Sequence, residues 1–191
     1  MWGANPNLVP AMDIHPHGLL ALGRPALAQL GRALFADHPE DAARYLHEMG
    51  YAAGEALHSA FVAWLRAEAR VDHPSELAAD ELGPRLSSFL VETGWGPVRL
   101  ERLSDAVLAI DAADPPEADP AAGYESPSCY LMSGLLADVL GRASGTTVAV
   151  MEVECRSQRA DTCRFLVGAP GTLERIYEHV IHGGVYSEIA G

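Results

Sequence analysis

Three cysteines stand at spacings that suit a metal site. Cys155 and Cys163 are separated by seven residues, so a hairpin between them would bring the two sulfurs together. Cys129 follows the Ser-Pro pair at 126–127, which predicts a helix start; in its first turn, free N–H groups and the helix dipole favour a thiolate. Three thiolates and one carboxylate make a reasonable four-coordinate set for zinc.

Two glutamates, Glu152 and Glu154, compete for the fourth ligand position, and spacing alone leaves both open. In an ideal strand Glu152 and Cys155 point to opposite faces, because side chains alternate with a period of two. If Glu152 binds a metal together with Cys155, the strand must bulge or turn at its end. Three arginines are placed to offset the negative charge of such a site: Arg156, Arg159 and Arg164.

The cysteines also have other interpretations. Free cysteine is among the most buried residue types, so inert core thiols need no function. A disulfide between Cys155 and Cys163 requires an oxidising compartment, whereas the odd number of cysteines favours a reducing one. A catalytic thiol needs a base, and no histidine lies close in sequence to any of the three. Inert core cysteines are therefore the main alternative to a metal site.

The elements that must position these residues begin with helices. Apolar residues recur at intervals of three and four residues, which predicts helices over 25–35, 39–68, 74–93, 126–142 and 170–181. Gly50 and Gly54 lie one turn apart in the second helix. Because glycine costs helix stability, we expect another element to approach both closely. The pair Gly83-Pro84 should kink the third helix or split it in two.

The apolar period changes after residue 94, and this change predicts short strands. They cover residues 98–103, 106–110, 146–155 and 163–167. Helices followed by a mostly antiparallel sheet, interrupted by one helix, predict an α+β fold with helices packed on the sheet. The acid-rich stretch 111–119 is expected to be a solvated connection or a mobile lid. Residues 1–23 are expected to form an irregular arm, and residues 24–191 a single domain.

Composition and charge limit the partners. The chain has 191 residues, of which 49% are hydrophobic and 20% charged, a balance typical of a globular domain. A net charge of −13 argues against direct binding of nucleic acid and against docking on anionic membranes. No stretch approaches the ~20 apolar residues that span a bilayer, so no membrane insertion is expected. The first residues lack the pattern of a signal peptide, and we expect a cytoplasmic location.

Several motifs together resemble the 4-vinyl reductase domain family. They are Pro127-Ser128-Cys129, Gly134-Leu135-Leu136-Ala137, the run VMEVECRS at 150–157, and Cys163-Arg164-Phe165. Upstream, LHEMGYAAG at 46–54 looks like the glycine-bearing helix of that family, and Gly94-Trp95-Gly96 looks like the turn into its sheet. The resemblance covers roughly residues 24–186.

The resemblance implies a fold, a metal site and a kind of function. The implied fold is α+β, with N-terminal helices on a mostly antiparallel sheet and a helix inserted before a zinc hairpin; it is related to vesicle-tethering (TRAPP-type) subunits and haem-nitric-oxide-binding domains. Members are typically dimers, and several are sensory modules for small hydrophobic or aromatic molecules. Carried over by motif, the ligands of a structural zinc are Cys129, Glu152, Cys155 and Cys163, which selects Glu152 over Glu154.

The chain also departs from that family. Arg159 stands where relatives favour glycine, so the turn between Cys155 and Cys163 is expected to differ. The strand that carries the phenol-gripping aromatics of the sensors reads AVLAIDAADPP here, without tryptophan, so phenol specificity is not supported. No nicotinamide or flavin fingerprint is present in the sequence, which argues against a reductase activity of its own.

Five residues are candidates for the wall of a ligand pocket: His58, Phe61, Trp64, Trp95 and Tyr130. His58 can point a polar group into an apolar pocket, although a histidine at the edge of the core is the simpler interpretation. Aromatic residues at helical spacing are also more often plain core.

Three functions follow, in this order of preference. The first is a zinc-stabilised domain that binds a small hydrophobic molecule as a sensor or carrier, with an enclosed apolar cavity. The second is an accessory protein or enzyme acting on a tetrapyrrole-like substrate, with a wider cleft. The third is a protein-interaction scaffold, with a filled interior and an exposed apolar patch. We nominate no catalytic residue, and the sequence favours binding over catalysis.

Overall fold

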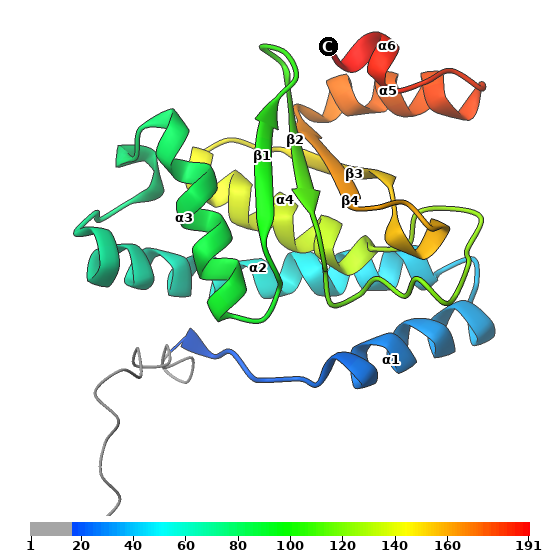
Figure 1. Ribbon diagram of the computed structural model, residues 1–191, viewed down its shortest axis with the longest axis horizontal. Helices are drawn as coiled ribbons and strands as arrows, with labels where there is room; N and C mark the ends of the chain where they lie inside the picture. Colours follow the sequence, from blue (N-terminus) through cyan, green and yellow to red (C-terminus); the bar gives the residue numbers. More distant parts are fainter. Residues whose placement is uncertain (1–16) are drawn as a thin grey trace, which may run out of the picture.

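A four-stranded antiparallel sheet lies at the centre of the fold (Figure 1). The computed structural model of the chain describes residues 17–191, so most of the expected N-terminal arm lies outside the described residues. The strands are β1 (Val98–Arg102), β2 (Val107–Ala112), β3 (Ala149–Glu154) and β4 (Cys163–Gly168). Their order in the sheet is β1-β2-β4-β3, with every neighbouring pair antiparallel. Together with the helices, this confirms the predicted α+β architecture.

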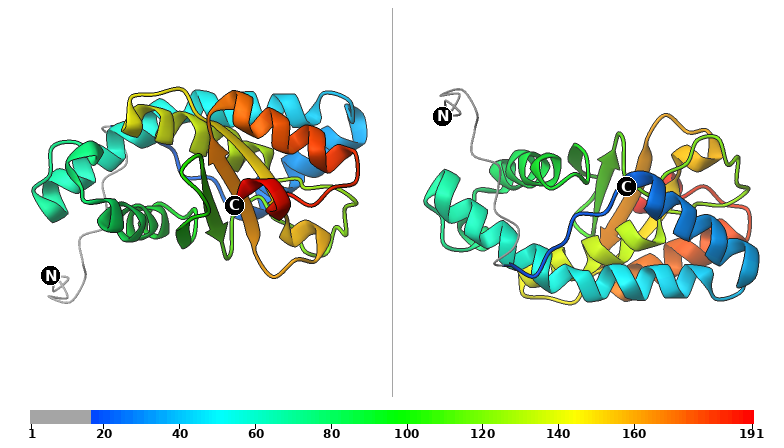
Figure 2. Two further views of the ribbon diagram at one scale, coloured as in Figure 1. Left: turned by 90° about the horizontal axis from the view of Figure 1, so that it is seen from above. Right: turned by 90° about the horizontal axis from the view of Figure 1, so that it is seen from below.

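Helices cover both faces of this sheet, as Figures 1 and 2 show. The helices α2, α3 and α4 pack on one face, whereas α5 and α6 cover part of the other. The α-helices are α1 (Arg24–Asp37), α2 (Ala42–Ala69), α3 (Ala79–Glu92), α4 (Tyr130–Ser144), α5 (Pro170–Ile181) and α6 (Ser187–Ala190). Two short 3-10 turns are η2 (Pro74–Glu76) and η3 (Arg156–Gln158).

Alternation along the strands divides the core into two layers. Ile110 and Phe165 are fully buried on the face that meets α2, α3 and α4. Their neighbours Ala109 and Leu166 are equally buried on the opposite face, where they pack against α5. The prediction for α5 itself, residues 170–181, matches the observed bounds. Its expected inward face is narrower than predicted, because Tyr177 is 54% exposed.

The two long helices of the core, α2 and α4, touch along a seam of small residues. A Cβ atom added at Gly50 would overlap the carbonyl oxygen of Leu131, and one added at Gly134 would overlap that of His47. A Cβ at Gly54 would collide with the Asp138 side chain. The close approach predicted from Gly50 and Gly54 is therefore confirmed, and it fixes the position of α4 against α2.

Two helix boundaries differ from prediction. The helix α3 runs continuously through Gly83-Pro84, and the break falls earlier, at Leu77-Ala78, where the backbone is extended. A helix starts afresh there because the Glu81 carboxylate accepts a hydrogen bond from the Ala78 N–H at 3.3 Å. The helix α4 begins at Tyr130, four residues later than expected. None of the helices within residues 17–191 has the length and apolar character needed to span a bilayer.

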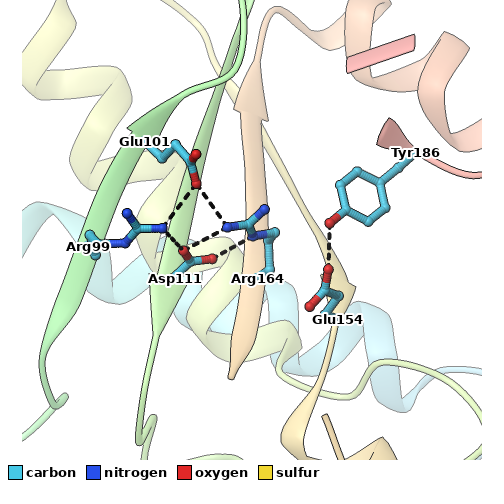
Figure 3. Close-up of polar contacts among 6 residues, drawn as sticks. All are labelled: Arg99, Glu101, Asp111, Glu154, Arg164 and Tyr186. Atoms are coloured by element: carbon cyan, nitrogen blue, oxygen red, sulfur yellow. Dashed lines mark hydrogen bonds and ion pairs between the residues drawn. The ribbon is translucent and has the colours of Figure 1, made fainter. Parts of the chain in front are cut away.

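The part of the outer sheet face that α5 and α6 leave uncovered carries a charge network (Figure 3). Arg164 donates two hydrogen bonds to Asp111, at 2.6 and 2.8 Å, and one to Glu101 at 3.0 Å. Arg99 binds the same two carboxylates, each at 3.1 Å. The hydrogen bonds from Arg164 in particular hold the pKa of Asp111 below its usual range.

We expect Asp111→Asn to lower the free energy of unfolding by about 2 kcal/mol at neutral pH, because a partly buried charged hydrogen-bond acceptor is lost. The pKa of Asp111 is lower in the folded chain than in the unfolded one. Its stabilising effect is therefore complete well above the unfolded value of about 3.9, and it is lost as pH falls through the folded value. Urea unfolding of parent and variant at pH 7 and pH 3 should show the difference shrinking in acid. A difference independent of pH would contradict this assignment.

Candidate metal centre

The three cysteine sulfurs meet between the start of α4 and the hairpin of β3 and β4. The Sγ–Sγ distances are 3.8 Å for Cys129 and Cys155, 3.7 Å for Cys129 and Cys163, and 3.9 Å for Cys155 and Cys163. All three residues are fully buried and free of disulfides. Together with a carboxylate oxygen of Glu152 they form a group whose potential ligand atoms lie within 4.8 Å of one another, and this group could hold a metal ion.

A β-bulge brings Glu152 to the same side as Cys155. On the partner strand, Glu152 lies opposite Phe165 and Glu154 lies opposite Arg164, so that Val153 is an extra residue. In a regular strand Glu152 and Cys155 would point to opposite faces; one extra residue reverses the side chains that follow it. The sequence required such a bulge if both residues were to share a site, and the structure has it at this place.

The Glu152 carboxylate has the environment of a metal ligand. Its Oε2 accepts a hydrogen bond from the Cys129 N–H at 2.8 Å. Its Oε1 is buried and has no hydrogen-bond partner. Burial, followed by the negative charge of Cys155, raises the pKa of this carboxyl to about 8. A buried oxygen without a partner is costly, and a cation among the sulfurs would satisfy it. The donor set therefore fits a metal ion.

Glu154 lies on the other side of the sheet and takes no part in this cluster. Its carboxylate accepts a hydrogen bond from the hydroxyl of Tyr186, just before α6 (Figure 3). The bulge at Val153 is the cause, because it turns Glu154 to the outer face together with its partner Arg164. The geometry therefore separates the two glutamates that spacing alone left open.

The protonation of the thiols differs from the expectation for a helix N-terminus. Hydrogen bonds with Cys155 and Cys163, together with burial, raise the pKa of Cys129. Hydrogen bonds from Cys129 and Cys163 lower the pKa of Cys155, which becomes the favoured thiolate. The reason is that Cys129 is the N-cap residue of α4, and the nearby backbone N–H groups are bound by carboxylates. These N–H groups are therefore not available to its sulfur.

The three arginines do not neutralise the cluster through ion pairs. Arg156 pairs with Asp114 at 2.7 Å, and Arg164 belongs to the network on the outer face. No ion pair within residues 17–191 joins Arg159 to another residue. Arg156 contributes through its backbone instead, since its N–H lies 3.3 Å from the Cys163 sulfur. Backbone dipoles thus act where the sequence suggested guanidinium charges.

Arg159 adopts a left-handed backbone conformation, with φ of 69° at the end of η3. This conformation costs a residue with a side chain roughly 1–2 kcal/mol, whereas glycine adopts it freely. We expect Arg159→Gly to raise the free energy of unfolding by about 0.5–1 kcal/mol, after allowing for the greater flexibility of glycine in the unfolded chain. Thermal unfolding of the two proteins measures the change. Arg70, with φ of 56°, offers a matched site at the end of α2.

If Arg70→Gly stabilises the chain and Arg159→Gly destabilises it, the Arg159 side chain makes a contribution larger than its backbone cost. That outcome would contradict the assignment of Arg159 as a strained substitute for glycine.

The five predicted pocket residues lie in two separate places. Phe61 and Trp64 pack with Phe89 in the core between α2 and α3, with centroid distances of 5.0 Å for Phe61–Phe89 and 6.0 Å for Trp64–Phe89. His58 lies one turn before Phe61; its Nε2 is buried without a partner, and burial lowers its pKa. Trp95 and Tyr130 instead pack in a smaller cluster beneath α1. The ligand-binding role of these residues stays a prediction.

Glu117 is the residue near the cluster that sequence reasoning missed. It lies in the acid-rich stretch between β2 and α4, where a solvated connection or lid was expected. Its carboxylate is instead buried and bound to the first turn of α4, and burial raises its pKa to about 8. The only sequence signal was an acid upstream of a helix whose own N-cap residue is a cysteine. Nothing local indicates a capping bond between residues so far apart.

The part of the chain that forms this cluster also matches a known family. Residues 108–169 match the family model of the 4-vinyl reductase domain, a range that contains all four residues of the metal cluster. The chain therefore carries a 4-vinyl reductase domain, and the resemblance seen in the sequence motifs is confirmed. No curated protein matches the chain in sequence.

Three solved structures share the fold. The phenol-responsive sensory domain of the transcription activator PoxR, solved with phenol, is 20% identical with a TM-score of 0.57, over 79% of this chain and 76% of that one. A vinyl-4-reductase family protein from Methanocaldococcus jannaschii is 20% identical with a TM-score of 0.50, over 81% and 88%. A trafficking protein particle complex subunit 3 from Naegleria fowleri, covalently bound to palmitic acid, is 15% identical with a TM-score of 0.57, over 76% and 91%.

Proposed function

We propose that this protein is a zinc-stabilised domain that binds a small hydrophobic molecule and acts as a sensor or carrier. The observation that carries the proposal is the buried group of three thiols and one carboxylate. These residues come from three elements far apart in the chain: the start of α4, strand β3 with the residue after it, and the start of β4. A single ion held by all four would cross-link these elements.

Zinc is the metal that the donor set supports best. A tetrahedral ion with Zn–S bonds of about 2.3 Å sets its sulfurs about 3.8 Å apart. The three sulfur pairs lie at 3.7, 3.8 and 3.9 Å. Thiolates are soft ligands that favour zinc over calcium or magnesium. Four protein ligands would leave no open coordination position, as in structural rather than catalytic zinc sites.

The small-molecule half of the proposal is supported by the relatives and by a groove. The PoxR domain was solved with phenol, and the Naegleria protein carries palmitic acid. In this chain a groove of about 710 Å³ lies between α3 and β1, within the range of roughly 300–1,000 Å³ of small-molecule sites. Apolar side chains of Pro84, Val91 and Leu100 line it, and so does Glu92, which accepts a hydrogen bond from Trp64 at 3.0 Å. We propose this groove as the entrance to the ligand site.

The setting of the domain is part of the same proposal. Three free buried thiols suit a reducing compartment such as the cytoplasm. We take residues 24–191 as one domain, which acts as a homodimer without direct contact to nucleic acid and without insertion into a membrane. The net charge of −13 supports the last two points.

A scaffold function is the second candidate, and one feature of the surface favours it. Large apolar side chains on and after α5 are exposed: Tyr177 at 54%, Ile181 at 58% and Val185 at 54%. Exposed apolar patches often mark protein–protein contacts. A scaffold would use this surface and would need no bound small molecule.

Native mass spectrometry of protein purified from its own host, without added metal, tests the proposal. We expect one zinc per chain in a dimer, and an additional small molecule that denaturing conditions release. A metal-free protein whose three thiols titrate freely would contradict the zinc half. A zinc-containing protein that carries no small molecule, and gains none on exposure to phenol or fatty acid, would favour the scaffold.

A further inference from the structure

The loop that connects β2 to α4 contacts both halves of the metal cluster. We call residues 113–125 the strap. Figure 1 shows that it passes the turn η3 before the chain enters α4. One half of the cluster is Cys129 at the start of α4, and the other is the hairpin with Cys155 and Cys163. Because these halves are far apart in the chain, a segment that contacts both can set the distance between them.

Glu117 joins the strap to the first half. Its Oε1 accepts a hydrogen bond from the Leu131 N–H at 3.0 Å, and its Oε2 accepts one from the Met132 N–H at 2.9 Å. These donors belong to the first turn of α4 and have no partner within the helix. A helix usually satisfies them with Ser, Thr, Asp or Asn at the N-cap. Here Cys129 occupies the N-cap position, and its sulfur makes no capping bond. Glu117 supplies the missing cap from outside the helix.

Ser157 joins the strap to the second half. It is fully buried in η3, between the two cysteines of the hairpin. Its hydroxyl accepts a hydrogen bond from the Asp119 N–H at 3.0 Å, and its carbonyl accepts one from the Tyr124 N–H at 2.9 Å. The neighbouring Arg156 forms an ion pair with Asp114 of the strap at 2.7 Å. The strap is therefore fixed to both halves by buried and surface contacts.

We propose that Glu117 is a positioning residue of the metal centre, and that the strap holds Cys129 at the correct distance from the hairpin cysteines. This inference rests on the proposed zinc site. Glu117 does not touch the metal; it fixes the start of α4, and thereby both the Cys129 sulfur and the N–H that orients Glu152 at 2.8 Å. Residues that orient metal ligands typically change metal affinity about 10–100-fold when they are replaced.

Replacing Glu117 by glutamine tests the inference with little change of shape. The carboxylate uses each oxygen for a different N–H, whereas an amide has one oxygen and would set its NH₂ group against the second N–H. We expect Glu117→Gln to lower zinc affinity about 10–100-fold in a titration against a chromophoric chelator. The absorption spectrum of the cobalt-substituted protein should also shift, because the ligand geometry changes. Glu125→Gln is the matched control: it has the same charge change in the same strap and an exposed residue whose side chain makes no hydrogen bond in the described structure.

A purely structural role would lower thermal stability but leave zinc affinity and the cobalt spectrum unchanged, and that result would overturn the inference. If Glu117→Gln does not fold, Ser157→Ala replaces it, because this variant removes only the hydroxyl bond to the Asp119 N–H. We expect it to lower zinc affinity several-fold, and an unchanged affinity would equally overturn the inference. A parent protein that binds no zinc would overturn the proposed function itself, and the parent alone reveals this.

Discussion

Replacing Cys155 by serine is expected to abolish tight metal binding and to lower the melting temperature by about 10 °C. Loss of a metal site belongs to the few changes that cost a domain about 4 kcal/mol or more, and each kcal/mol corresponds to roughly 2–4 °C at this size. The effect is large because metal binding is coupled to folding, and Cys155 is fully buried among the other ligands. Thermal unfolding and metal analysis of the purified variant measure the two expected changes.

The matched control for this experiment is Glu154→Gln. Glu154 is one residue away in sequence but lies on the outer face, where it accepts a hydrogen bond from Tyr186. We expect a loss of about 1 kcal/mol and an unchanged metal content. If Cys155→Ser melts like the parent and retains its metal, the ligand assignment is wrong.

Replacing Gly134 by alanine is expected to lower the free energy of unfolding by about 3 kcal/mol. The added Cβ would overlap the carbonyl oxygen of His47, which is a backbone atom of α2 and cannot rotate away. The helices α2 and α4 would have to separate, and the contact of Gly50 with Leu131 on the same seam would separate with them. Urea unfolding gives the free-energy change directly.

Gly31→Ala in α1 is the control for that prediction. It makes the same chemical change in a helix, but nothing lies within 4 Å of the added atom. Because alanine has the higher helix propensity, this variant should be neutral or more stable by up to about 1 kcal/mol. Equal effects of the two substitutions would show that the seam between α2 and α4 is not tightly packed.

Much of the metal site could be predicted because it depends on residue types and on the period of a strand. The cysteine spacing and the family resemblance selected Cys129, Glu152, Cys155 and Cys163, and these four residues lie together. The requirement for a bulge followed from the period of two, and the extra residue is Val153. In each case the sequence restricts local geometry strongly enough for one answer to remain.

Contacts between distant segments could not be predicted in the same way. The late start of α4 depends on Glu117, whose bonds to Leu131 and Met132 connect segments that no local pattern relates. The arginine pairings depend on which carboxylates the folded sheet places nearby, such as Asp111 beside Arg164. The aromatic candidates fall into two clusters for the same reason, because helical spacing predicts burial but not the partner.

X-ray absorption at the zinc edge of the purified protein tests the proposed metal centre most directly. We predict one zinc per chain, with three sulfur neighbours at about 2.3 Å and one oxygen neighbour at about 2.0–2.2 Å. The oxygen belongs to Glu152, so Glu152→Ala should remove or replace that single shell while the sulfur shell remains. Absence of zinc, or a zinc bound mainly by nitrogen and oxygen, would contradict the assignment of Cys129, Cys155 and Cys163 as its ligands.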